Sequence, residues 1–211
     1  EPPNLNIAVG NGYVLEGVNT AVRVYDLTGA PTLPIVLSSN QVFGLASAIN
    51  RTTGVNGPYL TDTRVFYDQG INRFFILQRG QDNDVYGDPL NQSHIYLAVS
   101  RTADPAGDYG IYIMDTTDAA NPGCPCVADY PQIGSDEYGF HIAWNEFSTF
   151  GERFVDAAVL SISKTSLAAG ATTPVSYRFL IPYGSGFEFA LQPATTPPGA
   201  SNFLASGGLA Y

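Results

Sequence analysis

Short stretches of alternating hydrophobic and polar residues recur along the chain, and turn-forming residues separate them. The segment AVRVYD at 21–26 alternates valine with arginine and tyrosine, which is the period of a strand with one buried face. Two earlier stretches, 5–10 and 13–18, flank Asn11-Gly12, a dipeptide typical of a tight hairpin turn. The pattern predicts an all-β chain.

One hairpin pattern occurs three times. Residues 64–78 contain a strand, an Asp/Gly turn and a second strand, and similar patterns occur at 132–145 and, more weakly, at 5–19. Each copy ends on an amide side chain, and the amides are separated by 59 and then 67 residues: Asn19, Gln78 and Asn145. This spacing predicts a four-stranded antiparallel unit every sixty or so residues, as in the blades of a β-propeller.

We predict one β-propeller-like domain over residues 1–211. Three complete blades are expected at about 5–45, 62–115 and 129–181, and the start of a fourth at 187–211. Propellers have about four to eight blades, so this number does not close a ring. We therefore consider three arrangements: a fragment of a larger propeller, completion by another chain, or sheets that pack without closing.

Finer sequence features locate elements inside the blades. LAVSRT at 97–102 aligns with LSISKT at 160–165, which predicts equivalent third strands in two blades. Residues 38–58 show no period and are expected to form a long loop. The same spacing places the inner strand of the fourth blade near 203–206.

Composition excludes several classes of partner. The chain is 45% hydrophobic and 12% aromatic, which is enough to bury a core without a cofactor. Nineteen acidic residues against nine basic ones give a net charge of -10, which argues against nucleic acid and anionic membranes. No stretch approaches the roughly 20 apolar residues of a membrane helix, so no membrane insertion is expected.

The expected location is secreted, extracellular or at the cell surface. The first residues, EPPNLNIAV, do not form a signal peptide, and removal of a leader would leave such a start. Two sequons, at Asn50 and Asn91, lie in polar, loop-like stretches and are candidate glycosylation sites.

Three segments carry a family resemblance: DTRVFYDQGINRF at 62–74, YLAVSRTADPAGD at 96–108 and DYPQIGSDEYGFHIAWNEF at 129–147. They resemble a family of uncharacterised secreted bacterial β-propellers, and the Asp-box turns of sialidase-like and BNR-repeat propellers. Arg73 departs from the Asp-box pattern, because an aromatic is expected there and Phe74 follows one place late. The resemblance implies a propeller scaffold whose Asp and Gly build turns, with no assigned reaction.

Oxygen-bearing side chains recur just before the expected inner strands. Asp62 and Asp129 occupy matching places in two blades, Asn4 lies in a similar place in the first, and Arg64 lies beside Asp62. If inner strands line a central channel, these groups meet at its mouth and could bind a polar ligand or a hard cation such as Ca²⁺. The alternative is local turn capping by each aspartate.

Four turn residues are expected to be structural. Asp68 and Asp136 recur in the hairpin turns, where a carboxylate accepts hydrogen bonds from nearby backbone N–H groups. Gly70 and Gly139 are expected to supply positive φ. Ca²⁺ binding is a lesser alternative, since no DxDxDG loop occurs.

The sequence favours no catalytic set. Four acidic residues are candidates for glycoside hydrolysis without distinguishing neighbours: Asp136, Glu137, Glu146 and Glu152. A sialidase-like site needs clustered arginines, and the candidates are Arg23, Arg64 and Arg178. His94 and His141 stand in no metal-binding pattern, and no GxSxG occurs. We therefore lean against an enzyme and expect no cofactor.

Cys124 and Cys126 are the only cysteines. In an oxidising compartment they form a structural disulfide, or each pairs with a cysteine elsewhere. A CxC pair alone supplies too few ligands for a tetrahedral zinc site.

Aromatic residues cluster near the third hairpin: Tyr138, Phe140, Trp144, Phe147 and Phe150. Most are expected in the core, and any exposed one could stack on a sugar ring. The function predicted is binding or structural support through the loops, with carbohydrate or protein as ligand. The alternatives are a sialidase-like glycoside hydrolase, and an assembly component completed by strand addition at 203–211.

Overall fold

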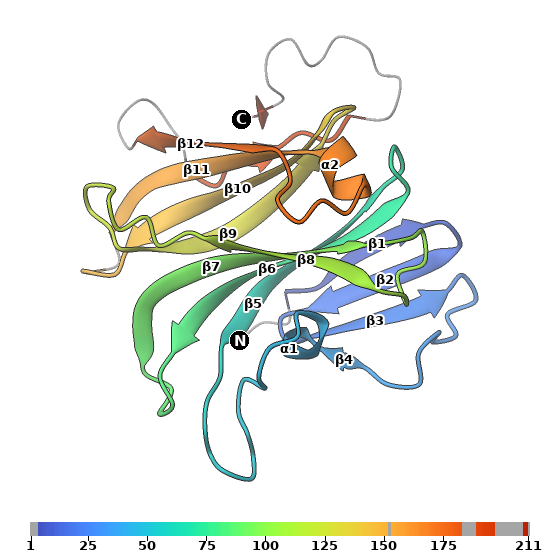
Figure 1. Ribbon diagram of the computed structural model, residues 1–211, viewed down its shortest axis with the longest axis horizontal. Helices are drawn as coiled ribbons and strands as arrows, with labels where there is room; N and C mark the ends of the chain where they lie inside the picture. Colours follow the sequence, from blue (N-terminus) through green and yellow to red (C-terminus); the bar gives the residue numbers. More distant parts are fainter. Residues whose placement is uncertain (1–3, 152, 183–188, 197–208, 211) are drawn as a thin grey trace.

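Three four-stranded antiparallel sheets form most of the protein (Figure 1). The computed structural model describes residues 4–151, 153–182, 189–196 and 209–210. Blade 1 contains β1 Asn6–Gly10, β2 Tyr13–Val18, β3 Ala21–Asp26 and β4 Leu37–Ser38. Blade 2 contains β5 Tyr59–Asp68, β6 Arg73–Asn83, β7 Pro89–Ser100 and β8 Tyr109–Asp115. Blade 3 contains β9 Cys126–Ser135, β10 Gly139–Ser148, β11 Phe154–Ser163 and β12 Ser176–Pro182.

The first strand of each blade is its inner strand. Strand β5 contacts β1 on one side and β9 on the other, so the blades follow one another in chain order (Figure 1). Strand β13 Gln192–Pro193 contacts β9 and pairs with β14 Leu209–Ala210, which forms a fourth, two-stranded sheet. The predicted all-β, propeller-like array of blades is confirmed.

The prediction of the fourth inner strand stays untested. It was expected near 203–206, which lies outside the described residues. Among the described residues, β13 borders β9, and a parallel bridge joins Ser135 to Thr195 just beyond it. The inner strands β1, β5, β9 and β13 begin at residues 6, 59, 126 and 192, so the last spacing is close to the one before it.

Hydrophobic cores fill the spaces between blades. Strand residues alternate between two faces, so each blade packs against both neighbours. Phe75 of blade 2 stacks on Phe140 of blade 3 with ring centroids 4.2 Å apart, at the centre of the largest core. A second core joins blades 1 and 2 around Leu15 and Ile76, and a third joins blade 3 to Leu191 before β13.

A residue with left-handed backbone recurs within or just before each inner strand. The φ angles are 50° at Asn4, 54° at Asp62, 50° at Tyr130 and 57° at Ala190. At Asp62 and Tyr130 the register with the second strand shifts, which defines a β-bulge. The repeated bulge is a structural marker of the blade that residue types do not reveal.

The strand register shows that the predicted repeat of amide side chains is one residue off in blade 2. Counted from the bulges, Arg79 occupies the place of Asn19 and Asn145, and Gln78 lies one residue earlier. This place joins successive blades, because Asn19 Oδ1 accepts from the backbone N–H at residue 62 (3.1 Å) and Asn145 Oδ1 from the one at residue 190 (2.8 Å).

The third strands β7 and β11 are equivalent, as predicted, but their alignment is also one residue off. Leu97 is equivalent to Val159 rather than to Leu160. Both faces of these strands are buried against neighbouring blades, so aliphatic residues follow one another and residue type does not report the face.

Two short helices follow strands. Helix α1 Ser39–Val42 lies in the predicted loop and begins with a capping box between Ser38 and Gln41. Helix α2 Lys164–Ala168 follows β11 and is capped by Ser163. Among the described residues, neither helix has the length and apolar character that crossing a membrane requires.

Candidate functional site

Side chains from three blades meet beside the bulges of the inner strands. Arg79 Nε lies 2.6 Å from Asp62 Oδ2 and 3.7 Å from Asp129 Oδ1. Asn4 Nδ2 donates to Asp62 Oδ1 at 2.8 Å. We call these four residues the inter-blade cluster. The predicted convergence of Asn4, Asp62 and Asp129 therefore occurs in the structure, whereas ligand binding there stays a prediction.

The bulges determine which residue types meet. Asp62 is the bulge residue of blade 2, and its equivalent in blade 3 is Tyr130, so Asp129 lies one place earlier than the sequence comparison suggested. Thr63 Oγ1 donates to the carbonyl of Val18 at 2.7 Å, which fixes the start of β5 against blade 1.

Arg64 does not join the inter-blade cluster. Its guanidinium carbon lies 5.3 Å from the centre of the Tyr130 ring, and Nη1 donates to the carbonyl of Thr63. Residues two apart in a regular strand share a face, but the bulge between Thr61 and Arg64 breaks this alternation. The cation of the cluster is Arg79 from β6, which sequence reasoning missed because the contact depends on strand register.

A groove of about 530 Å³ opens beside the cluster between blades 2 and 3. Its walls include Arg79 and Asp129, the half-buried Phe147, and Asn91 of the second sequon. The Asp129 side chain is 42% exposed, compared with 17% for Asp62. Asp129 thus offers carboxylate oxygens to the groove, while Asp62 is held by Arg79 and Asn4.

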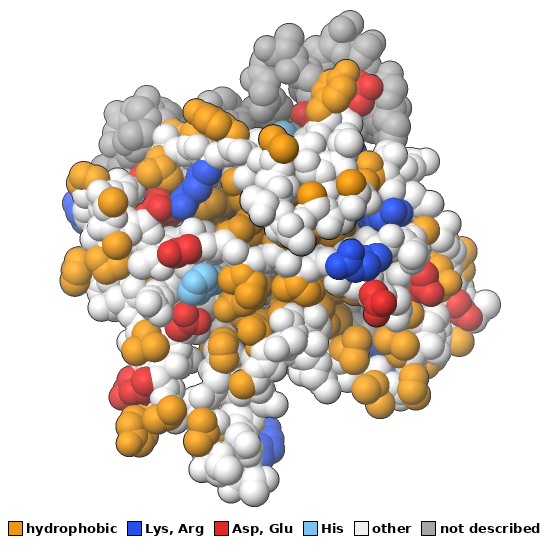
Figure 2. Space-filling model, in the orientation of Figure 1, with side chains coloured by type: hydrophobic (Ala, Val, Ile, Leu, Met, Phe, Trp, Pro, Cys, Tyr) orange, Lys and Arg blue, Asp and Glu red, His pale blue; other side chains and the backbone are white. Residues whose placement is uncertain are grey.

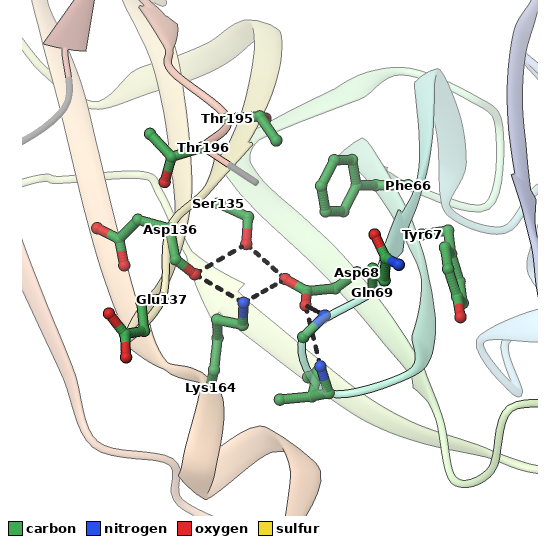
Figure 3. A pocket seen from close by; sticks show the side chains of 12 residues that line it. Phe66, Tyr67, Asp68, Gln69, Ser135, Asp136, Glu137, Lys164, Thr195 and Thr196 are labelled. Carbon is green, nitrogen blue, oxygen red and sulfur yellow. Dashed lines mark hydrogen bonds and ion pairs between the residues drawn. The ribbon is translucent and has the colours of Figure 1, made fainter. Parts of the chain in front are cut away.

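A second concavity of about 450 Å³ lies where the same inner strands end (Figure 3). Lys164 Nζ lies 2.7 Å from Asp68 Oδ2 and donates to the backbone carbonyl of Asp136 at 2.6 Å. Ser135 Oγ donates to the same Asp68 oxygen at 2.5 Å. Asp68 and Lys164 are both buried, so this ion pair is part of the blade 2–blade 3 junction.

The two turn aspartates have different second partners. Asp68 Oδ1 accepts from the N–H groups of Gly70 (2.8 Å) and Ile71 (3.1 Å). Asp136 Oδ1 accepts from the N–H groups of residues 138 and 139, and its Oδ2 lies 3.0 Å from His141 Nε2. Burial acts to raise the pKa of Asp136, but these hydrogen bonds outweigh it and lower the pKa.

The expectation of positive φ at Gly70 and Gly139 is wrong. Neither has φ in the left-handed region, and in the first turn Asn72 takes that conformation with φ of 54°. Close approach explains both glycines instead. A Cβ would lie 3.1 Å from Lys164 Nζ at Gly70 and 2.6 Å from the His141 ring at Gly139.

The three candidate arginines do not gather at one place. Arg23, Arg64 and Arg178 lie on β3, β5 and β12 of three different sheets. Glu137 borders the Lys164 concavity, and residue 152 lies outside the described residues. The histidines are also apart, since His94 lies 3.4 Å from Asp82 while His141 pairs within blade 3.

Glu146 is completely buried in blade 3. Its Oε1 accepts from Trp144 Nε1 (3.0 Å) and Arg178 Nη2 (2.5 Å). Arg178 also pairs with Asp118. Burial chiefly, and then the charge of Asp118, raise the pKa of Glu146 to about 8, although Arg178 opposes the shift.

The remaining candidates have defined surroundings. Cys124 and Cys126 form a disulfide, and Asn50 and Asn91 are exposed. Of the clustered aromatics, Phe140 and Trp144 are buried, whereas Tyr138 and Phe150 are exposed. Figure 2 shows acidic and basic side chains scattered over one face without a basic patch, in keeping with the acidic composition.

Comparison with known proteins adds little to this picture. No protein-family model matches the sequence, and no curated protein matches it significantly. Among solved structures, an α-L-arabinofuranosidase from Lactobacillus brevis is similar at 12% identity and a TM-score of 0.45. The alignment covers 85% of this chain and 53% of that chain, so this chain spans about half of that enzyme's length. At this level of similarity we infer nothing about the site from it.

Proposed function

We propose that the protein is an extracytoplasmic binding module that holds a carbohydrate in the groove beside the inter-blade cluster. The observation that carries the proposal is the position of Asp129, whose exposed carboxylate faces the groove next to Arg79. Among the described residues, the ion pairs of Arg79 with Asp62 and Asp129 leave the other oxygen of Asp129 and the terminal N–H groups of Arg79 available to a ligand.

The chemistry of the groove suits a polyhydroxylated ligand. A carboxylate accepts hydrogen bonds from sugar hydroxyls, and a guanidinium donates to their oxygens in a fixed plane. Phe147 adds an apolar surface for the C–H face of a sugar ring. A net charge of -10 disfavours anionic ligands, so we expect neutral sugars.

Glycoside hydrolysis is the first alternative. It needs a second carboxyl group that is free to act on the bound sugar. Asp62 is the nearest carboxylate, and Arg79 and Asn4 occupy its oxygens. This arrangement supports binding rather than turnover at the cluster.

Assembly through strand addition is the second alternative. The edge expected at 203–211 lies mostly outside the described residues, and β14 already pairs with β13. Sedimentation at increasing protein concentration tests this alternative, because strand addition predicts growing oligomers and a binding module does not.

A glycan array followed by calorimetry tests the proposal. The wild-type protein is expected to bind neutral oligosaccharides, and Asp129→Asn to weaken binding by about tenfold, as expected for one charged hydrogen bond. Asp108→Asn is the matched control, since Asp108 is exposed and far from the groove-lining residues. Equal binding by Asp129→Asn and wild type would overturn the proposal, and release of reducing sugar would replace it with hydrolysis.

A further inference from the structure

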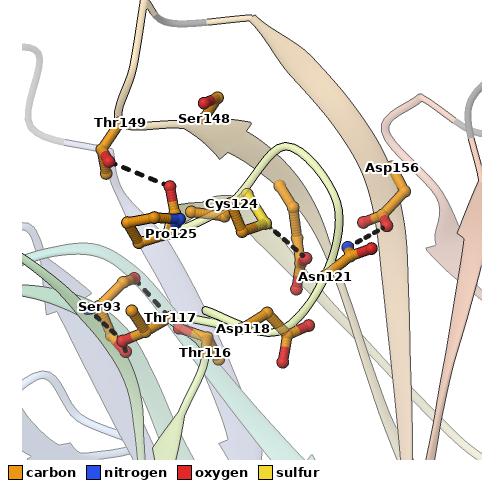
Figure 4. Close-up of a disulfide and its surroundings, with 12 residues drawn as sticks. Ser93, Thr116, Thr117, Asp118, Asn121, Cys124, Pro125, Ser148, Thr149 and Asp156 are labelled. Atoms are coloured by element: carbon orange, nitrogen blue, oxygen red, sulfur yellow. Dashed lines mark hydrogen bonds between the residues drawn. A yellow bond between two sulfur atoms is a disulfide. The ribbon is translucent and has the colours of Figure 1, made fainter.

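The disulfide loop of blade 3 places two sulfur atoms against a buried carboxylate. The ligand atoms of Cys124, Cys126 and Glu146 all lie within 4.8 Å of one another. Figure 4 shows the disulfide and the loop around it. Cys126 and Glu146 are completely buried, while Cys124 is partly exposed. This site lies on β9, β10 and the preceding loop, and its lining is separate from that of the proposed sugar groove.

The two oxygens of Glu146 are in different situations. Oε1 is held by Trp144 and Arg178, whereas Oε2 faces Cys124 Sγ at 4.0 Å. A disulfide sulfur carries no hydrogen and cannot donate to this oxygen. The Glu146 carboxyl also hydrogen-bonds to Asp156, so one end of this buried group lies against the sulfur of Cys124 and close to a second carboxyl group.

The loop is held in place by bonds other than the disulfide. The carbonyl of Pro125 accepts from both the backbone N–H (2.9 Å) and Oγ1 (3.0 Å) of Thr149. The N–H of Cys126 donates to the carbonyl of Thr117 at 2.7 Å, and that of Cys124 to Asn121 at 3.0 Å. Opening the disulfide thus leaves both cysteines beside Glu146.

We propose that reduction of the Cys124–Cys126 disulfide creates a zinc site formed by the two thiolates and Glu146 Oε2, with a water as fourth ligand. Zinc binds sulfur at about 2.3 Å and carboxylate oxygen at about 2.1 Å, so ligand atoms lie about 3.5 Å apart. Side-chain rotation of the freed cysteines provides that separation. The neighbouring carboxylates of Asp118 and Asp156 add negative charge that favours a cation over an anion.

The chemical steps balance with a dithiol reductant. Its first thiolate attacks the partly exposed Cys124 Sγ, and Cys126 leaves as a thiolate. The second thiol of the reductant then displaces Cys124, so the reductant becomes a disulfide and the protein gains two thiols. Zn²⁺ replaces the protons of these two thiols and releases them to solvent.

Metal binding to the full chain tests the proposal. The protein is reduced with dithiothreitol, desalted without oxygen and titrated with Zn²⁺ in competition with a chromogenic chelator. We expect one Zn²⁺ per reduced chain and none per oxidised chain. Co²⁺ in place of Zn²⁺ is expected to give near-ultraviolet thiolate-to-metal absorption, which reports the sulfur ligands directly.

Three variants decide the ligand set. Cys124→Ser should abolish the near-ultraviolet absorption that two thiolates give when they bind Co²⁺. Glu146→Gln should weaken Zn²⁺ binding more than about tenfold. Glu137→Gln is the control, because Glu137 is an exposed glutamate outside the site. Circular dichroism of the oxidised Glu146→Gln protein checks that it folds. Zinc binding that is equal in the oxidised and reduced proteins, or unchanged in Cys124→Ser, overturns the proposal.

Discussion

The only lysine of the chain lies buried between blades 2 and 3, where it neutralises Asp68. Asp68 accepts two turn hydrogen bonds through one oxygen and binds Lys164 and Ser135 through the other. One residue therefore shapes a local turn and also joins two blades. Turn statistics explain the first role, and only the packed structure shows the second.

Lys164→Met is expected to lower the free energy of unfolding by about 3–5 kcal/mol, because it leaves a buried Asp68 carboxylate without its cation. Urea denaturation measures the change. The double variant Asp68→Asn/Lys164→Met removes both charges and should recover part of the loss. If the loss in the double variant equals the sum of the losses in the two single variants, the ion pair contributes nothing to the junction.

Glu146 gives the oxidised protein a pH-dependent stability. Its pKa is raised to about 8 in the folded protein, above the ordinary value of 4.5, mainly through burial. The folded state thus holds this proton more tightly than the unfolded state, and stability falls as pH rises from about 4.5 through about 8. Glu146→Gln carries no such proton. The unfolding free energy of wild type minus that of Glu146→Gln should therefore fall as pH rises over this range. A difference that stays constant with pH would contradict the raised pKa of Glu146.

At the scale of single elements, the ends of a strand could be predicted from the sequence where a turn defines them. Strands β2 and β3 match the predicted residues at both ends, because Asn11-Gly12 and the alternation that follows define them locally. Strand β7 starts at Pro89, well before the predicted third-strand residues 97–102, since its first four residues are exposed. Helix α1 was missed because four residues show no helical period.

The candidate site was only partly predictable for a related reason. Asp62 and Asp129 were found from recurrence along the chain, whereas Arg79 joins them through register and a bulge. Inter-blade contacts of this kind depend on how sheets pack. Local sequence carries no signal for them.

Close approach between inner strands makes Gly10 a sensitive position. A Cβ there would lie 2.2 Å from the ring of Tyr67 in the neighbouring blade. Gly10→Ala should lower the free energy of unfolding by about 1–3 kcal/mol through overpacking. Gly107→Ala is the matched control, since its nearest atom would be 3.5 Å away. Thermal unfolding measures both, and equal midpoints would contradict the close packing of β1 on β5.

At the scale of the whole molecule, shared cores couple the blades to one another. No blade buries both faces by itself, because each core contains residues from two neighbouring blades. Repeated units that stack in this way stabilise each other through their interfaces. Loss of a core residue in one blade should therefore destabilise the neighbouring blade as well.

Phe140 provides the direct test of this coupling. It is completely buried and stacks on Phe75 across the blade 2–blade 3 junction, so Phe140→Ala should cost about 3–5 kcal/mol. Hydrogen exchange followed by mass spectrometry is expected to show lost protection in β6 and β7 as well as in β10 and β11. Tyr138→Ala, at an exposed position two residues away, should leave both regions protected. Lost protection confined to β10 and β11 would mean that the blades open independently, and the shared core would then contribute little to the cohesion of the array.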